Sequence, residues 1–142
     1  MLGRGLLIDV THVANGEIQI EDAEARGEIR RGDLVFSRID WSSLAPWDRY
    51  REPHPKLAVE VIERLASCGV NAVGIDAPGL GQGRRHAERD RLLAENDVLV
   101  IENLANLASI PVEEFTVCCL PLKLEDVDAI PARVLAEVEA GR

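Results

Sequence analysis

The sequence is poor in aromatic residues and in positive charge, and it has no long apolar run. Aromatic side chains account for 4% of the 142 residues, so the core must be aliphatic. Acidic residues outnumber basic ones by 25 to 16, and the net charge of −9 argues against nucleic acid and anionic membranes as partners, because both are polyanions. No segment approaches the roughly 20 apolar residues that cross a bilayer. No basic segment followed by an apolar one stands near the start, so no secretion signal is predicted.

Cysteine is also scarce, with three residues in the chain. Cys118 and Cys119 are adjacent, so in a strand they would point to opposite faces and could not easily pair. All three lie in apolar segments, and no C-x-x-C pair of the kind that binds zinc occurs. We therefore expect reduced core residues in a cytoplasmic protein, and the length predicts one domain.

The apolar pattern predicts an α/β protein. Strands are expected at residues 5–10, 17–20, 34–39, 72–75, 98–101 and 115–122, and helices at 21–26 and 55–68. Residues 86–95 read as a charged helix or an irregular turn, and the pattern at 129–138 does not decide between strand and helix. The helix at 55–68, with Pro55 in its first turn and Gly69 at its end, followed by a strand, forms half of a βαβ unit.

The stretch from Asp90 to Leu107 carries the strongest functional signal. Four consecutive aliphatic residues at 98–101 predict a strand buried on both faces, and Glu102 follows directly. A carboxylate at the carboxyl end of such a strand lies where open α/β sheets bind ligands. Asn103 could then cap the next turn. Glu102 is the first candidate site residue.

An aromatic loop is expected at residues 41–55. It holds Trp41, Trp47 and Tyr50, which are both tryptophans and the only tyrosine of the chain. Such a loop could shape a substrate pocket or a subunit contact, or it could simply plug the core. His54, set between two prolines, could cap the next helix or take part in chemistry, whereas His12 is interpreted as structural.

Glycines give two further, weaker signals. Gly74 lies inside the strand at 72–75, which indicates that another group packs closely against the backbone there. The loop at 78–85 is rich in glycine but lacks both G-x-G-x-x-G and a G-K-[ST] ending, so phosphate binding is not favoured.

Several segments, taken in order, resemble the cyclase family, also called the kynurenine formamidase-like metal-dependent hydrolases. The most specific pair is G-I-D-A-P at 74–78 with I-E-N-L-A-N-L at 101–107. The other matching segments are L-L-I-D-V at 6–10, I-E-D-A-E at 20–24, R-G-D-L-V-F-S-R-I-D-W at 31–41, the strand at 115–122 and P-A-R-V at 131–134.

The resemblance implies a swivelling β/β/α domain with a mixed sheet and flanking helices, here N-terminally shortened and spanning residues 1–142. It also implies a homo-oligomer that hydrolyses an amide, often an N-formyl group on an aromatic amine. One or two divalent metals, zinc or manganese, would support the reaction, and the substrate would be a small molecule.

The family's main metal motif, His-x-Gly-Thr-His-x-Asp-x-Pro-x-His, occurs nowhere in this sequence. In the family a histidine also stands twelve residues before the glutamate that Glu102 matches. Asp90 occupies that position here, and the nearest histidine is His86, four residues earlier. The resemblance thus assigns Glu102 and Asp90 as metal ligands, with Asp90 and His86 as catalytic candidates. An aspartate there replaces a neutral base with an anion.

Three hypotheses follow. The chain is a metal-dependent amide hydrolase, or it keeps the fold as a non-catalytic binding or assembly protein. A variant of the second is that Met1 is not the true start and a histidine-rich segment precedes it. In the third, Glu102 forms only a structural ion pair with Arg84, Arg85 or Arg91. An open N-terminal strand edge and the aromatic loop would favour self-association.

Overall fold

The computed structural model describes residues 1–25, 27–46 and 48–138. The strands are β1 (Leu2–Asp9), β2 (Glu17–Ile18), β3 (Leu34–Arg38), β4 (Lys56–Leu57), β5 (Ala72–Ile75), β6 (Leu99–Ile101), β7 (Glu114–Pro121) and β8 (Ala132–Glu137). The helices are α1 (Ile20–Glu24), α2 (Val59–Cys68) and α3 (Arg84–Ala94), with short 3₁₀ turns at Trp41–Leu44, Asp48–Arg51 and Leu107–Ser109. Among the described helices, we find none whose length and apolar character would suffice to cross a bilayer.

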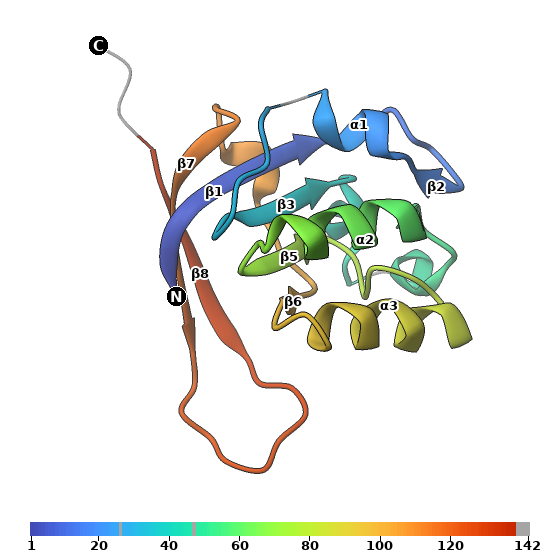
Figure 1. Cartoon of the computed structure of the whole chain (residues 1–142). Coiled ribbons are helices and arrows are strands. Elements are labelled where there is room, and N and C mark those ends of the chain that lie inside the picture. The colour runs from blue at the N-terminus through green and yellow to red at the C-terminus, as the bar shows by residue number, and fades with distance from the viewer. Residues whose placement is uncertain (26, 47, 139–142) are drawn as a thin grey trace.

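Six strands form one mixed sheet in the order β6-β5-β3-β1-β7-β8. The first four run parallel to one another, whereas β7 pairs antiparallel with both β1 and β8. Helices α2 and α3 lie against the parallel part of the sheet, and the β7–β8 hairpin projects away from it (Figure 1). This arrangement confirms the expected α/β class with a mixed sheet and flanking helices.

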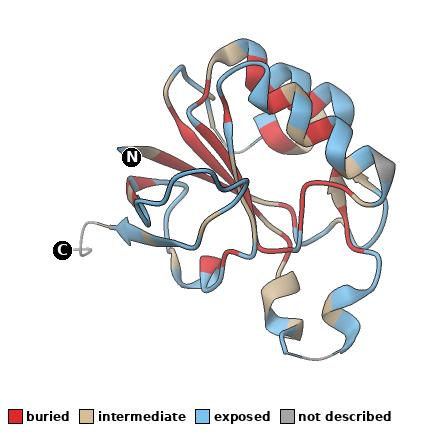
Figure 2. Ribbon diagram, turned by 90° about the horizontal axis from the view of Figure 1, so that it is seen from below, coloured by how far each residue is buried: buried red, intermediate tan, exposed pale blue. Residues whose placement is uncertain are grey.

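The core has two parts, one on each face of the sheet. Alternation along β1 directs Leu6 and Ile8 toward the helices, where Val61, Ile62, Leu65 and Ala66 of α2 are also buried. Leu7 faces the other way and joins Phe36 and Phe115 under the segment that follows β6. The buried residues concentrate in the parallel strands and the inner faces of the helices (Figure 2). The prediction of a mainly aliphatic core is confirmed.

Some boundaries differ from the prediction. The helix expected at 55–68 begins at Val59, because Lys56 and Leu57 pair with β2 as a short parallel strand. Pro55 therefore does not lie in its first turn, and His54 does not cap it. Gly69 ends the helix as predicted, at a φ of 70°. The strand expected at 17–20 ends at Ile18, since α1 begins at Ile20.

The interpretation of residues 98–101 as a strand buried on both faces is wrong. β6 is an edge strand with β5 as its one neighbour in the sheet, and the side chain of Leu99 is 55% exposed. The expected open N-terminal edge is wrong as well, because β1 lies between β3 and β7. A run of aliphatic residues indicates apolar surroundings, but it does not indicate whether other strands will pair on both sides of it.

The remaining ambiguous segments are defined by the structure. Residues 84–94 form a regular helix, and the segment around 129–138 contributes the strand β8. The three cysteines are free thiols. Cys119 is buried but Cys68 and Cys118 are only half-buried, so the expectation that all three lie in the core holds for Cys119 alone. Gly74 is closely approached by Phe36 and Leu104, as predicted, and a Cβ atom there would lie 2.6 Å from the Phe36 ring.

Candidate metal centre

Polar groups gather at the carboxyl ends of the parallel strands. Asp76 directly follows β5, and Glu102 directly follows β6, its neighbour in the sheet. Because the two strands are parallel, their carboxyl ends lie together, and the two carboxylates therefore lie at the same end of the sheet. Asp76 is almost fully buried and accepts hydrogen bonds from the Ile39 amide at 2.9 Å and the Ser42 hydroxyl at 3.4 Å. Its role is to tie the start of the aromatic loop to the sheet.

Helix α3 supplies the other side of the site. His86, Arg89, Asp90 and Leu93 follow the i, i+3, i+4, i+7 spacing that places residues on one helix face. Leu93 is fully buried in the core, so this face points inward. His86 and Asp90 are therefore brought to the sheet edge, beside Glu102.

The three sequence candidates form one cluster. His86 Nε2 lies 3.4 Å from an Asp90 carboxylate oxygen and 3.6 Å from a Glu102 carboxylate oxygen. One ligand atom from each residue can be chosen so that all lie within 4.8 Å of one another. The side chains are about one third exposed, which leaves the cluster open to a solute from solvent.

This geometry fits a divalent cation. Ligands about 2.1 Å from a tetrahedral ion are separated by roughly 3.4 Å, close to both observed distances. Among the described residues, the buried side-chain atoms that lack a hydrogen-bond partner are Nδ1 of His86 and Oδ1 of Asp90. Buried polar atoms are normally paired, so two orphans on neighbouring ligands indicate that a further group belongs there.

The charge state of the cluster also suits a cation. Burial raises the pKa of Asp90, and the charge of His86 opposes that change. Burial likewise raises the pKa of Glu102, with His86 opposing and the Asp90 charge adding to the rise. Two partly desolvated carboxylates close together are unfavourable without a counterion. A bound cation would remove that penalty.

Gly79 forms the wall of the cluster. A Cβ atom at this position would lie 2.7 Å from the His86 ring and 3.2 Å from a Glu102 carboxylate oxygen, and the backbone φ of +134° favours glycine. We expect Gly79→Ala to displace the imidazole, lower the free energy of unfolding by about 1–3 kcal/mol and weaken Zn²⁺ binding. Chemical denaturation and calorimetric titration measure both effects.

Gly83→Ala is the matched control for this substitution. Gly83 also has a positive φ, at +59°, but a Cβ atom there would meet nothing within 4 Å. It should share the backbone strain of Gly79→Ala while leaving metal affinity unchanged. Equal losses of affinity in the two variants would show that the wall at Gly79 plays no part in the cluster.

Part of the aromatic loop reaches this site. The Tyr50 hydroxyl donates a 2.6 Å hydrogen bond to the side-chain oxygen of Asn103, and the indole of Trp41 donates to the Tyr50 carbonyl. Burial raises the pKa of Tyr50, as do the charges of Asp76 and Glu102. Trp41 packs against the core, as the interpretation of the loop as a plug expects. Trp47 lies outside the described residues, and the pocket assignment stays a prediction.

The expected capping role of Asn103 is not observed. Asn103 adopts a φ of 56° and its side chain accepts from Tyr50 rather than from the amides that follow. Its backbone amide donates to the Ala77 carbonyl, and that of Leu104 donates to the Ile75 carbonyl, so the chain stays beside the end of β5. Asn103 thereby orders Tyr50 beside Glu102.

The other two histidines have separate surroundings. The buried His54 lies against Trp41 with ring centroids 5.8 Å apart, and its Nδ1 must donate to the Pro55 carbonyl at 2.7 Å. Burial lowers the pKa of His54, which favours the neutral ring. The exposed His12 pairs with Asp22 at 2.9 Å, away from the cluster, which agrees with a structural interpretation.

The hypothesis of an arginine pair for Glu102 finds no support from Arg85 or Arg91, and the side chain of Arg84 lies outside the described part of the chain. Arg85 contacts Glu17 at 3.7 Å, and Arg91 contacts Glu95 at 3.3 Å. The ionisable side chain that the structure places beside Glu102 is instead that of His86, at 3.6 Å.

Sequence reasoning missed Arg89. Its guanidinium is buried and donates to the Leu57 carbonyl at 2.7 Å, to the Arg85 carbonyl at 3.1 Å and to Glu17 at 3.1 Å. The helical spacing of Arg89 with Leu93 was the one signal that could have indicated an inward position. Arg89 anchors α3 to β2 and β4 and so positions the two residues that α3 contributes to the cluster.

Comparison with known proteins places these features in a family context. A family model described as "Putative cyclase" matches residues 1–82. Kynurenine formamidase of Erythrobacter litoralis is 32% identical over 129 residues, which cover 90% of this chain and 56% of that protein. Kynurenine formamidase of Paracidovorax citrulli is 32% identical over 140 residues, covering 98% and 60%. The chain thus spans between half and two thirds of the length of these relatives.

Solved structures agree on the fold. A "predicted metal-dependent hydrolase" from Bacillus stearothermophilus matches with a TM-score of 0.80 and 32% identity, over 95% of this chain and 63% of that one. Isatin hydrolase A from Labrenzia aggregata matches with a TM-score of 0.84 and 24% identity, over 95% and 60%. The fold expected from the sequence resemblance is confirmed.

Proposed function

Because the chain belongs to the cyclase family, we propose that it is the metal-binding part of a metal-dependent amide hydrolase. In this proposal His86, Asp90 and Glu102 hold one divalent cation, zinc or manganese, and the substrate is a small N-acyl or formamide compound. The observation that carries it is the cluster itself, in which His86, Asp90 and Glu102 each offer one ligand atom and these atoms lie within 4.8 Å of one another, beside two buried side-chain atoms, His86 Nδ1 and Asp90 Oδ1, that lack a hydrogen-bond partner.

The substrate class is proposed from the relatives. The two kynurenine formamidases are named for cleaving a formamide, and each is 32% identical to this chain. Tyr50, whose hydroxyl donates to Asn103 directly after Glu102, supplies an aromatic ring near the cluster, and Trp41 donates to its carbonyl; an aromatic ring there suits an aromatic amine. An amide substrate that carries an aromatic ring would therefore place its amide group at the cluster and its ring against the aromatic surface.

The residues have separable roles. When bound, the divalent ion polarises a carbonyl and lowers the pKa of a water molecule toward 7. Glu102 and Asp90 supply the negative charge that holds the cation, and His86 supplies a neutral nitrogen. Asp90 and His86 also offer the unpartnered Oδ1 and Nδ1 atoms, so they are the groups we assign to proton transfer. Tyr50 orients the aromatic part of the substrate.

A second function is favoured by a specific feature of the sequence. The histidine-rich motif that supplies most of the family's metal ligands is absent from these 142 residues, and Asp90 stands where a histidine is expected. With three ligands from one segment, the chain by itself should bind the ion weakly and turn over slowly or not at all. The alternative is a cyclase-fold binding or assembly protein without catalysis.

Metal titration combined with a hydrolysis assay separates these functions. We expect calorimetry to give one Zn²⁺ or Mn²⁺ per chain and N-formylkynurenine to be hydrolysed far more slowly than by an intact kynurenine formamidase assayed in parallel. Stoichiometric binding with no turnover above free metal would support the non-catalytic alternative. Absence of specific binding for either ion would overturn the proposed metal centre.

A further inference from the structure

The cluster of His86, Asp90 and Glu102 is rich in oxygen donors and poor in nitrogen donors. Two of its side chains are carboxylates, and the imidazole of His86 turns Nε2 toward both of them, at 3.4 and 3.6 Å. Among the residues that the structure describes, no cysteine or second histidine joins this group. Imidazole and thiolate suit zinc, whereas carboxylate oxygen suits harder cations such as Mn²⁺. The donor set therefore favours a hard cation.

Asp90 can offer both of its carboxylate oxygens to a cation. Its Oδ2 faces His86, and its Oδ1 is buried without a hydrogen-bond partner. A carboxylate that binds through both oxygens raises the number of ligand atoms around the ion. Octahedral ions such as Mn²⁺ accept six oxygen ligands, whereas zinc sites are mostly tetrahedral. The orphaned oxygen thus points in the same direction as the choice of donors.

His86 lacks the support that zinc-binding histidines usually have. Such a histidine normally donates its second ring N–H to a carboxylate, a carbonyl or water, which makes the coordinating nitrogen more basic. The second nitrogen here is Nδ1, which is buried beside Gly79 and has no hydrogen-bond partner in the described part of the chain. The imidazole therefore adds less to zinc affinity than a supported histidine would, and the carboxylates decide which ion is preferred.

We propose that Asp90 sets the metal preference of the cluster, and that its carboxylate makes this a manganese-accepting site rather than a zinc-selective one. The inference rests on the proposed metal centre and adds the identity of the ion to it. Asp90 lies one helical turn after His86 on the same face of α3. A histidine at this position would complete the i, i+4 pair that binds zinc on helices, and the aspartate supplies oxygen in its place.

Exchanging the donor at position 90 tests the proposal. Calorimetry gives the dissociation constants for Zn²⁺ and Mn²⁺, and electron paramagnetic resonance of free Mn²⁺ shows how much manganese zinc displaces. In the native chain the two constants should lie within about tenfold of each other, and Asp90→His should raise the preference for zinc by at least about tenfold. Asp90→Asn keeps an oxygen donor without the charge, so it should weaken binding of both ions by similar factors.

Glu88→His is the matched control for Asp90→His. Glu88 is exposed and lies two positions from both His86 and Asp90, so it belongs to another face of α3. The substitution removes the same charge and adds the same side chain without reaching the cluster. Its preference between the two ions should equal that of the native chain, and circular dichroism checks that each variant folds.

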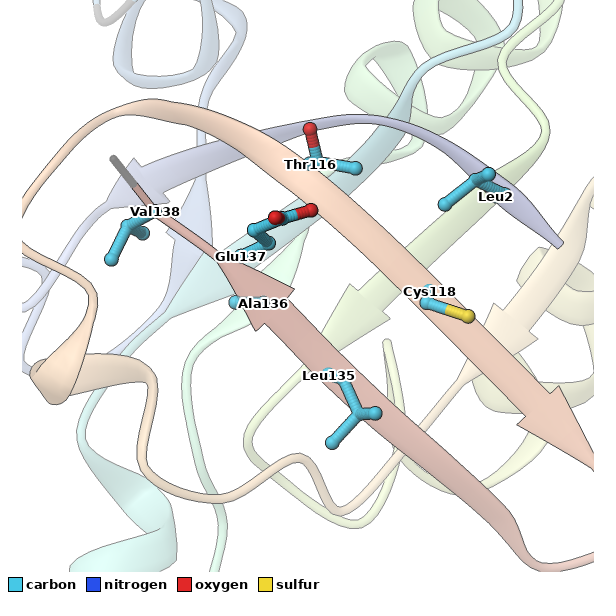
Figure 3. A pocket seen from close by; sticks show the side chains of 7 residues that line it. All are labelled: Leu2, Thr116, Cys118, Leu135, Ala136, Glu137 and Val138. Carbon is cyan, nitrogen blue, oxygen red and sulfur yellow. The ribbon is translucent and has the colours of Figure 1, made fainter. Parts of the chain in front are cut away.

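Free thiols are the other donors that attract zinc. Cys118 lines a groove with Leu2 and Leu135 (Figure 3), and β5, β3 and β1 lie between its strand β7 and the strand β6 that leads to Glu102. Cys68 is also half-buried. The double variant Cys68→Ser/Cys118→Ser should bind both ions as the native chain does. A changed ratio would show that the thiols set the preference, which would overturn the proposal.

Two further results would overturn the role of Asp90 while leaving the metal centre intact. One is a native chain that binds Zn²⁺ more than about tenfold more tightly than Mn²⁺, and the other is Asp90→His with the preference of the native chain. Absence of binding for both ions to the native chain would instead overturn the metal centre, and this inference with it.

Discussion

Replacing Glu102 with glutamine is expected to weaken binding of Zn²⁺ or Mn²⁺ by at least about 100-fold, more than the 10–100-fold that loss of a supporting group outside the ligands costs. The amide keeps the size of the carboxylate but removes the negative charge next to His86. Because burial raises the pKa of Glu102, the unliganded protein does not depend on that charge. Its free energy of unfolding at neutral pH should therefore stay within about 1 kcal/mol of wild type. Calorimetric titration and urea denaturation measure the two quantities.

Glu95→Gln is the control for this prediction. Glu95 lies just after α3 and pairs with Arg91 on the surface, so its replacement changes the net charge equally without touching the cluster. Metal affinity in this variant should equal that of wild type. The opposite pattern for Glu102, a large loss of stability with unchanged metal binding, would show that the carboxylate is structural and would contradict the proposed centre.

Much of the fold could be predicted because local patterns decide local structure. The strand at 72–75 has the bounds that its aliphatic run indicated, and Gly69 ends α2 where its φ of 70° is needed. The order of the strands could not be predicted in the same way. β6 and β8 are edges because of pairings between segments far apart in the sequence, and an apolar run reads alike at an edge and in the middle of a sheet.

The residues of the candidate site likewise fall into two groups, those that the sequence indicates and those that only the folded structure explains. Glu102 could be identified from the sequence because it directly follows a strand, and the family resemblance indicated Asp90 and His86. The structure brings the three together, although their roles stay predictions. Gly79 and Arg89 were not identified: Gly79 acts through the absence of a side chain, and the spacing of Arg89 with Leu93 is a weak signal on a helix with many charges. Only the partners across the fold explain either residue.

Arg89 carries the second large expected effect. Replacing it with methionine keeps most of the side-chain volume and the helix propensity but removes the donors to the Leu57 carbonyl and to Glu17. Breaking a fully buried ion pair costs about 3–5 kcal/mol, and because Glu17 is one third exposed we expect a loss of about 2–4 kcal/mol in the free energy of unfolding. The melting temperature should fall by about 10 °C. Metal affinity should fall too, because α3 loses its anchor to β4.

Arg85→Met separates this anchoring from a general effect of charge. Arg85 belongs to the same helix and contacts the same Glu17, but its side chain is 66% exposed and the distance is 3.7 Å. An exposed pair of this kind contributes under about 1 kcal/mol, so both stability and metal affinity should remain near wild type. If Arg89→Met were as mild as Arg85→Met, the buried guanidinium would not be what fixes α3 against the sheet. The cluster would then owe its geometry to the apolar packing of Leu93 alone.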